Sequence, residues 1–324
     1  MINLHLNFFL DQIIILMGAL LLDVAIGEFP EKIHPVVWTG KLIEFVEPHF
    51  RKSQNKLLSG TLLVVFVEIL FVGAMVLINY ALFYVTIVYI IVSVFFVKSS
   101  FALRGMRDHI EPIISSIEKN DLEKARLFLS RTVRRETANL PRELICSAAI
   151  ETISEGLVDG FTGPLFYFSF FFLPGSFFYR VANTFDSEIG YNDDKNRLFG
   201  RFAAHLDTLL NYIPSRLTAY VSYISAYIIG LRPRSFQLYT VSRKTASRNA
   251  GWPMGAFSNI IGVRLEKKGE YILNDDFRYP DVEDVRTALK LHSLTSAIFT
   301  LVITVPILIF LSRQLGGSSL GIHL

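Results

Sequence analysis

Residues 134–168 read R-R-E-T-A-N-L-P-R-E-L-I-C-S-A-A-I-E-T-I-S-E-G-L-V-D-G-F-T-G-P-L-F-Y-F, and residues 173–191 read L-P-G-S-F-F-Y-R-V-A-N-T-F-D-S-E-I-G-Y. Residues 203–216 continue with A-A-H-L-D-T-L-L-N-Y-I-P-S-R. In all three stretches, carboxylates, amides and arginines recur at helical spacing directly beside strongly apolar segments. Polar groups in this setting predict a functional site on helices at the edge of a membrane.

The first of these stretches predicts a helix over residues 140–156. Pro141 suits the first turn of a helix, where no backbone donor is missed, and Gly156 suits its end. Cys146 lies inside this helix among small residues, which favours a packed thiol over a nucleophile.

Three carboxylates lie on one face of this helix or near the continuation of that face, namely Glu151, Glu155 and Asp159. Like charges one turn apart repel each other and destabilise an isolated helix. Carboxylate oxygens are the ligands that Mg²⁺ takes together with phosphates and water. Their crowding beside a membrane therefore predicts a cation site. The alternative is a solvated helix face that is paired with Arg142 or Arg135.

Composition places the chain among membrane proteins. Hydrophobic residues make up 51% of the 324 residues and charged residues 19%, and the mean hydropathy is +0.41. A net charge of +3 is too small for a nucleic-acid footprint, so no nucleic-acid partner is expected. The single cysteine excludes an intrachain disulfide. No Lys or Arg precedes the first apolar run, so a cleaved signal peptide is not expected.

Four apolar runs are long enough, at roughly 20 residues, to cross the hydrocarbon core as helices. They are residues 8–26, 57–79, 80–97 and 293–311. The second and third form a tight hairpin, and Pro306 is expected to kink the last run. Two further segments, 161–178 and 206–229, are apolar but interrupted by prolines and polar residues. The last predicted span keeps its orientation only if both of these segments cross the membrane or neither does. We favour two re-entrant segments, because all polar motifs then lie on one side of the membrane.

The predicted fold is therefore mainly α, a polytopic membrane protein with four spanning helices, two interrupted segments and cytoplasmic helical loops. Residues 1–324 form one integral-membrane domain. Within it, residues 98–160 form a cytoplasmic helical insert with the acidic motif, and residues 231–291 form a cytoplasmic loop region with a turn or hairpin at E-K-K-G-E-Y-I-L. The excess of Lys and Arg in the loops after the first and third spans places these loops, and the active site, on the cytoplasmic side of the cell membrane.

Further candidate residues lie three or four positions apart, the spacing that places side chains on one face of a helix. On a helix, Arg180, Asn183 and Ser187 share one face, and the guanidinium of Arg180 suits phosphate or carboxylate. Asp207 and Asn211 repeat the one-turn spacing. Arg216 lies at the start of an apolar run, where an ionisable side chain is costly and is therefore a functional candidate. The alternative is that its side chain only extends to the membrane interface.

Two stretches outside these helices also contain candidates. Asp23 and His34 flank the stretch D-V-A-I-G-E-F-P-E-K-I-H, although a lone histidine is more often packed than reactive. Asn249 lies in S-R-N-A-G-W-P-M-G-A, whose glycines permit an anion-binding turn. The chain contains no G-x-x-x-x-G-K-[ST], C-x-x-C or G-x-S-x-G motif, which weighs against a P-loop ATPase, a structural zinc site and a typical serine hydrolase.

Taken together, the chain resembles the CobD/CbiB family of adenosylcobinamide-phosphate synthases, which are membrane proteins of cobalamin biosynthesis. The resemblance covers nearly the whole chain. Its motifs are D-V-A-I-G, H-P-V-V-W-T-G, R-R-E-T, E-T-I-S-E-G-L-V-D-G-F-T-G-P-L-F-Y, Y-R-V-A-N-T-F-D-S-E-I-G-Y, A-A-H-L-D-T-L-L-N-Y-I-P-S-R-L-T-A, N-A-G-W-P-M-G-A and G-V-R-L-E-K-K-G-E-Y. The chain departs from the family pattern at Glu28, where the family has aspartate, and at Gly156, where it has asparagine.

The resemblance implies an ATP-dependent amide ligase. The enzyme would join (R)-1-amino-2-propanol, or its O-phosphate, to a propionate of adenosylcobyric acid and give adenosylcobinamide or its phosphate. A carboxylate does not acylate an amine unaided, so ATP would convert it to an acyl phosphate while Mg²⁺ neutralises the oxygens in transfer. ATP and Mg²⁺ are the expected cofactors, the corrinoid is a substrate, and the lipid bilayer and a homo-oligomer are further expected partners.

Carried onto this chain, the resemblance assigns three groups of residues. The catalytic group is His34, Asp23, Glu155 and Arg180, with His34 or Asp23 as the general base. The substrate-binding and nucleotide-binding group is Arg135, Glu136, Asn183, Asn211, Arg216 and Asn249. The metal ligands are Glu151, Glu155, Asp159, Asp186 and Asp207.

Two functions of other classes stay open on the sequence alone. In a membrane transporter, the same carboxylates and arginines would line a pathway. In a non-catalytic sensor or accessory protein, they would bind ligand without turnover. Product formation from corrinoid acid, amine and MgATP distinguishes all three.

Overall fold

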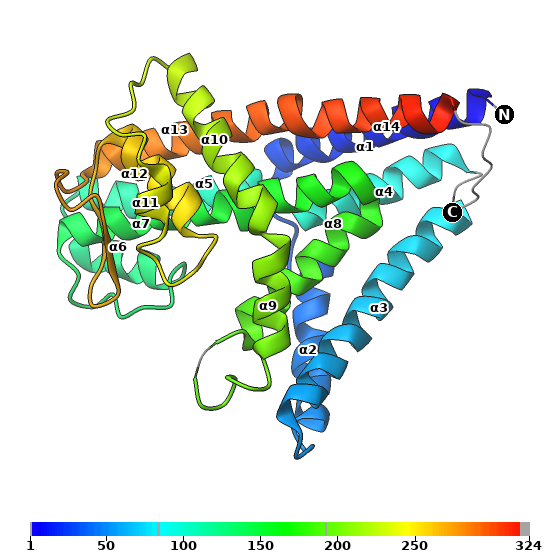
Figure 1. The fold of residues 1–324 in the computed structure, drawn as a ribbon, viewed down its shortest axis with the longest axis horizontal. Coiled ribbons are helices and arrows are strands. Elements are labelled where there is room, and N and C mark those ends of the chain that lie inside the picture. The colour runs from blue at the N-terminus through cyan, green and yellow to red at the C-terminus, as the bar shows by residue number, and fades with distance from the viewer. Residues whose placement is uncertain (1, 83–84, 192, 318–324) are drawn as a thin grey trace. The chain divides into compact units, whose positions relative to one another are not determined.

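The computed structural model describes residues 2–82, 85–191 and 193–317, and this part of the chain is mainly helical (Figure 1). Its backbone contacts divide it into two compact units. Unit 1 comprises Met1–Ala102, Gly163–Leu210 and Thr300–Leu324, and unit 2 comprises Leu103–Thr162 and Asn211–Phe299. Each unit is assembled from segments that are distant in the sequence.

Five helices in the described part are long and apolar enough to cross a membrane. They are Phe9–Ile26, Lys56–Leu82, Thr86–Glu118, Arg142–Ile189 and Val282–Gln314. The predicted spans 57–79 and 293–311 each fall within one of them, and 8–26 matches the first except for residue 8. The predicted span 80–97 begins in Lys56–Leu82 and continues in Thr86–Glu118, and the interrupted segment 161–178 lies within Arg142–Ile189. The other interrupted segment, 206–229, lies in none of the five. The chain is therefore a mainly α, polytopic membrane protein, as predicted.

Unit 1 contains the first four helices of the chain and three later ones. They are α1 (Ile2–Ile26), α2 (Pro35–Phe50), α3 (Lys56–Leu82), α4 (Thr86–Ser100), α8 (Gly163–Ile189), α9 (Arg201–Leu210) and α14 (Val305–Gly317), with the π-helix η2 (Thr300–Thr304) before α14. The predicted hairpin boundary at residue 80 is wrong, because α3 continues to Leu82 and α4 begins at Thr86. The helix is disturbed near Pro306, as predicted: the π-helix η2 ends at Thr304, two residues before this proline, which has no N–H to donate.

The core of unit 1 is formed where α3 and α8 pack together. Leu63, Val64 and Val67 of α3 are fully buried against Val181 and Phe185 of α8. Gly60 allows an especially close approach, since a Cβ atom there would lie 1.9 Å from the carbonyl oxygen of Phe199. These contacts fix the orientation of α8, the helix that carries the Y-R-V-A-N-T-F-D-S motif.

The helix α8 is interrupted inside the apolar segment that the sequence marked as irregular. Phe172 has φ 54° and ψ −143°, a conformation that L-residues rarely adopt, and Pro174 follows two residues later. Because proline removes a backbone donor, the break coincides with the P-G pair of the sequence. The interruption predicted for residues 161–178 is confirmed.

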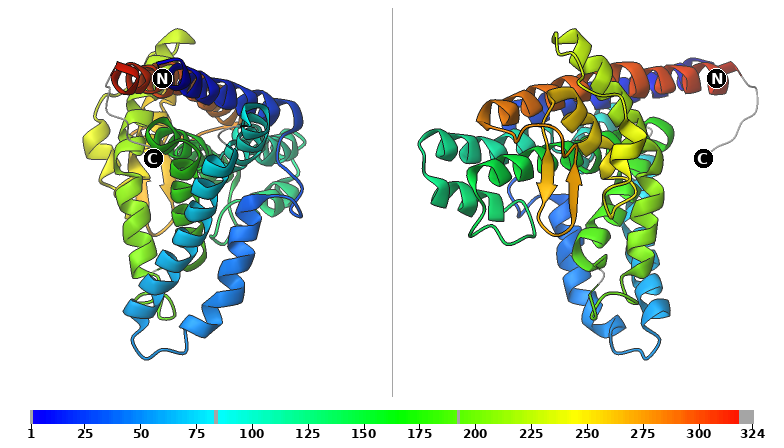
Figure 2. Two further views of the ribbon diagram at one scale, coloured as in Figure 1. Left: turned by 90° about the vertical axis from the view of Figure 1, so that its right-hand side faces the viewer. Right: turned by 60° about the vertical axis from the view of Figure 1, so that its left-hand side comes forward.

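Unit 2 contains the remaining elements. They are α5 (Leu103–Glu118), α6 (Leu122–Ser130), α7 (Arg142–Leu157), the π-helix η1 (Val158–Thr162), α10 (Tyr212–Ile228), α11 (Leu238–Ser242), α12 (Gly251–Ile261), β1 (Leu265–Lys267), β2 (Tyr271–Leu273) and α13 (Val282–Phe299). The strands pair antiparallel with Leu265 opposite Leu273 (Figure 2), which confirms the hairpin predicted at E-K-K-G-E-Y-I-L.

The helix predicted over residues 140–156 is α7, and both of its ends differ from the prediction. Pro141 is the N-cap rather than a first-turn residue, and its extended backbone starts the helix at Arg142. Gly156 does not end the helix, which continues through Leu157 into η1. A Cβ atom at Gly156 would meet only the end of the flexible Met106 side chain. This glycine therefore serves packing and not termination.

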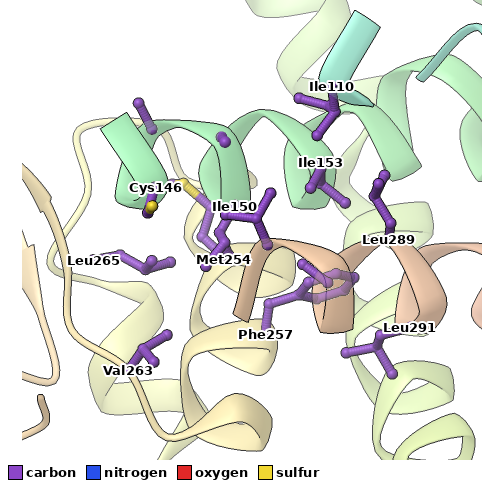
Figure 3. Close-up of a cluster of buried hydrophobic side chains, with 14 of the residues drawn as sticks. Ile110, Cys146, Ile150, Ile153, Met254, Phe257, Val263, Leu265, Leu289 and Leu291 are labelled. Carbon is purple, nitrogen blue, oxygen red and sulfur yellow. The ribbon is translucent and has the colours of Figure 1, made fainter. Parts of the chain in front are cut away.

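A large apolar cluster from α5, α7, α12, β1 and α13 forms the core of unit 2 (Figure 3). The helical spacing of Ile110, Ile113, Ile114 and Ile117 in the sequence predicts an apolar stripe on one helix face, and all four side chains of α5 are fully buried in this core. Cys146 is also buried here, in agreement with the interpretation of a packed thiol. This core holds α7 and the β1–β2 hairpin against each other, which positions the acidic motif.

Candidate functional site

A pocket of about 390 Å³ lies between α2 and α8 in unit 1. One face of α2 contributes Val36, Val37, Gly40 and Lys41, and one face of α8 contributes Arg180, Asn183, Thr184, Ser187 and Glu188. The α8 residues recur at steps of three and four, the spacing that aligns side chains on a helix. The predicted face of Arg180, Asn183 and Ser187 is thus confirmed, and it lines a hollow.

The pocket has a mixed but net positive lining. Lys41 and Arg180 supply two cations, and Glu188 supplies one carboxylate. Arg180 Nη1 donates to Asn183 Oδ1 at 3.3 Å, and Asn183 Nδ2 donates to Asp207 Oδ1 of α9 at 3.3 Å. Three of the predicted site residues are therefore connected in a single chain of hydrogen bonds. Two cations beside hydroxyl and amide groups are an arrangement that suits an anion such as phosphate.

A buried ionic network lies beside the start of α2. Lys98 Nζ lies 3.1 Å from Asp23 Oδ1 and 3.6 Å from Glu28 Oε2, and the Lys98 and Asp23 side chains are fully buried. His34 Nε2 lies 3.0 Å from the same Glu28 oxygen. The two predicted bases, His34 and Asp23, thus belong to one network. It also contains Lys98 and Glu28, to which the sequence analysis assigned no role.

His34 is fixed at both ring nitrogens. The backbone N–H of Val36 donates to His34 Nδ1 at 3.3 Å, so His34 is the N-cap of α2. Because Nδ1 accepts, the neutral ring carries its proton on Nε2 and donates it to Glu28. Burial raises the pKa of Glu28, but the hydrogen bond from His34 and the charge of Lys98 outweigh it and hold the pKa below its usual value. An ionised Glu28 therefore orients the histidine that starts one wall of the pocket.

The acidic motif of unit 2 is already neutralised at its first carboxylate. Arg135 Nη2 lies 2.6 Å from Glu151 Oε2, Ser147 Oγ donates to Glu151 Oε1 at 2.8 Å, and Tyr271 OH donates to Glu151 Oε2 at 2.9 Å. Glu151 is buried, so this guanidinium compensates a charge that would otherwise be costly. Among the described residues, the cation beside Glu151 is Arg135.

The other predicted metal ligands are more dispersed. Glu155 is exposed one turn after Glu151, within electrostatic range of Arg135 and Lys267. Asp159 lies in η1, where the α-helical periodicity behind its prediction no longer holds. Asp186 lies on α8 outside the pocket lining. Over residues 2–82, 85–191 and 193–317, no group of three His, Cys, Asp or Glu side chains could hold a metal ion.

A second predicted pair does come together in unit 2. Arg216 Nη1 donates to Asn249 Oδ1 at 2.9 Å. The guanidinium carbon lies 3.7 Å from the ring centroid of Tyr212 and 4.8 Å from that of Trp252. The two remaining predicted binding residues are less informative: Asn211 directly precedes α10 and is buried, and Glu136 is exposed.

Several residues of these clusters were missed by reasoning on the sequence. They are Lys41, Lys98, Ser147, Glu188, Trp252 and Tyr271. For Lys98 the sequence contained a signal. Lys98 ends one apolar run and Asp23 lies in another, and each charge is costly alone but favourable as a pair. For Tyr271 no local signal exists, since its contact with Glu151 spans two segments that only the tertiary fold brings together.

Comparison with known proteins adds an independent finding. A family model described as "CobD/Cbib protein" matches residues 16–300. A "Probable cobalamin biosynthesis protein CobD" of Thermoplasma volcanium is 40% identical over 301 residues, which cover 93% of this chain and 99% of the relative. A "Cobalamin biosynthesis protein CobD" of Dehalococcoides mccartyi is 35% identical over 298 residues, which cover 90% and 96%. No solved structure matches the chain significantly.

Proposed function

Because the chain belongs to the CobD/Cbib protein family, and therefore has a role in cobalamin biosynthesis, we propose that it is the membrane-bound amide ligase of that pathway. In this proposal it uses ATP to join (R)-1-amino-2-propanol O-phosphate to a propionate of adenosylcobyric acid. The observation that carries the choice of substrate is the pocket between α2 and α8, with Arg180 and Lys41 in its lining.

The pocket matches the amine substrate in size and in charge. A volume of about 390 Å³ is in the range of small-molecule sites, and a corrinoid is much too large for it. An amino-alcohol phosphate carries a phosphate at one end and an ammonium at the other. The guanidinium of Arg180 and the ammonium of Lys41 suit the phosphate, and the Glu188 carboxylate suits the ammonium. The free amino alcohol would leave the two cations without a counterion.

The amine must lose a proton before its nitrogen attacks. Of the two predicted bases, His34 fits this step better, because its neutral ring has an unprotonated Nδ1 whose 3.3 Å hydrogen bond is long. Asp23 is fully buried and lies 3.1 Å from Lys98, so it is engaged in an ion pair. We assign Asp23, Lys98 and Glu28 the task of holding His34 and the start of α2 in place.

The residues of unit 2 fit the binding of MgATP in part. Mg²⁺ is usually held by one or two carboxylates together with substrate phosphates, and Glu155 is an exposed carboxylate beside the cations Lys267 and Arg135. When bound, the nucleotide would supply the phosphoryl group that activates the propionate. Glu155 would hold the ion, while Lys267 and Arg135 would offset the phosphate charge. Glu151 would keep Arg135 in position.

One assay tests the proposal. The purified protein in nanodiscs is incubated with adenosylcobyric acid, MgATP and either the amino alcohol or its phosphate, and products are measured by mass spectrometry. We expect one adenosylcobinamide phosphate for each ATP consumed, and a clear preference for the phosphorylated amine. Ligand flux into vesicles without ligation would indicate a transporter, and binding without turnover would indicate a sensor; both outcomes contradict the proposal.

A further inference from the structure

A long segment of unit 2 carries positive charge without any negative charge. Residues 208–265 contain seven Lys and Arg and no Asp or Glu. Five of these cations are exposed, namely Arg232, Arg234, Arg243, Lys244 and Arg248, and Lys244 is paired with Asp275 at 3.2 Å. In the protein as a whole Asp and Glu nearly balance Lys and Arg, 29 against 32, so their absence from this segment creates a local excess of positive charge.

Exposed aromatic side chains lie among these arginines. Tyr220, Phe236 and Tyr239 are 58%, 67% and 63% exposed. The ring centroid of Trp252 lies 6.2 Å from that of Tyr220 and 6.5 Å from that of Tyr239. The guanidinium of Arg243 lies 5.5 Å from the Tyr239 centroid. Tyr220, Trp252, Tyr239 and Arg243 thus lie together across α10, α11 and α12. Arg232, Arg234 and Phe236 lie in the segment that connects α10 to α11, where the Phe236 ring stacks on Tyr223 of α10.

The outer face of α10 extends this surface. Ile213, Tyr220, Ile224 and Tyr227 recur at steps of seven, four and three, which places them on one face of the helix, and each is about half exposed or more. This helix lies in none of the five candidate spans. Isoleucine and tyrosine exposed on one face of a helix suit a segment whose apolar face is buried in the membrane interface.

We propose that this surface, formed by Tyr220, Phe236, Tyr239 and Trp252 with Arg232, Arg234 and Arg243, binds the anionic lipid headgroups of the bilayer. Tyrosine and tryptophan prefer the headgroup level, because their rings are apolar and their polar atoms stay hydrated. Arginines near a membrane surface are attracted to anionic lipids. A soluble polyanion would have no use for the exposed isoleucines of α10, so the lipid surface is the partner that accounts for both features.

Trp252 provides a reporter for this contact, because the chain contains only two tryptophans. In the full-length Trp38→Phe variant, Trp252 is the single source of tryptophan fluorescence. The protein is reconstituted in vesicles of one composition, four parts phosphatidylcholine to one part phosphatidylglycerol. In one set the bromine quencher is on the phosphatidylglycerol, and in the other the same mole fraction of phosphatidylcholine is brominated.

We expect brominated phosphatidylglycerol to quench Trp252 more strongly than brominated phosphatidylcholine, with an apparent preference of roughly fivefold or more that declines as salt is added. Replacing Arg232, Arg234 and Arg243 by Gln should reduce the preference to about one. The salt titration tests the proposal even if this triple variant does not fold.

A matched variant controls for overall charge. Lys119→Gln, Arg131→Gln and Lys268→Gln remove three exposed cations of unit 2 outside the surface, and they should leave the preference unchanged. Equal quenching by the two lipids would overturn the proposal, as would a loss of preference in this control. An absence of quenching by either lipid would also overturn it and would indicate a soluble partner.

Discussion

Replacing Lys98 by methionine is expected to lower the free energy of unfolding by about 3–5 kcal/mol, the usual cost of removing one partner from a buried ion pair. Lys98 and Asp23 are fully buried and 3.1 Å apart. The substitution keeps the length and packing of the side chain but leaves the Asp23 carboxylate without the ammonium. The change should be measured as the shift of the unfolding transition of the purified protein in one fixed detergent.

The double variant is the control for this prediction. When Asp23→Asn accompanies Lys98→Met, no uncompensated charge is buried at this position, and most of the lost stability should return. If Lys98→Met is as stable as the wild type, the ion pair does not hold α1 and α4 together. If the double variant is as unstable as the single one, the loss comes from packing and not from charge.

Replacing Arg180 by glutamine is expected to reduce kcat/KM for the amino-alcohol phosphate by roughly 10- to 100-fold, which corresponds to losing one or two charge-assisted hydrogen bonds. Most of the effect should be in KM, because the phosphate does not take part in bond making. Binding of the amine phosphate, measured by calorimetry without ATP, should weaken by a similar factor.

Two further variants make this result specific. Arg180→Lys keeps the charge and should recover part of the affinity. Lys52→Gln removes an exposed cation that is not part of the pocket lining and should bind like the wild type. The pocket would not be the binding site of the amine if Arg180→Gln had an unchanged KM and accepted the free amino alcohol as well as its phosphate. This outcome would leave the proposed ligase activity itself standing.

Local patterns in the sequence predicted the parts of this protein that are determined locally. The isoleucine stripe of α5, the hairpin at Leu265–Leu273 and the shared face of Arg180 and Asn183 depend on spacing of a few residues, and the structure confirms all three. Apolar length predicted the spanning helices for the same reason, since a helix crosses a bilayer only if nearly all of its side chains are apolar.

The ends of α7 and the interruption by η1 were not predictable in the same way. Gly156 is a typical helix end, yet packing of α7 in the unit 2 core keeps the helix intact to Leu157. The π-helix that follows changes the periodicity, so Asp159 cannot be placed by counting in steps of four. Tertiary packing outweighed local preference at both positions.

Partners across the fold were the hardest part to predict. The repulsion between Glu151 and Glu155 indicated that a cation lies nearby, and the structure provides one in the Arg135 guanidinium. Pairing with Arg135 was the alternative to a metal site in the sequence analysis, whereas the resemblance assigned Arg135 to the substrate. The sequence did not decide between the two, because the position of Arg135 does not reveal that it folds back onto α7. The Lys98–Asp23 pair joins residues 75 positions apart. The cost of each charge in an apolar run indicates that each residue needs a partner, but the sequence does not indicate which residue the partner is.

The activation of the carboxylate by ATP is the central claim, and an isotope experiment tests it most directly. Adenosylcobyric acid labelled with ¹⁸O in the reacting carboxyl group is converted by the purified protein with MgATP and the amino-alcohol phosphate. If an acyl phosphate forms, one ¹⁸O atom per amide bond must appear in inorganic phosphate, and the other must stay in the amide. Amide formation without ¹⁸O in any phosphate-containing product, or no amide at all, would contradict the account.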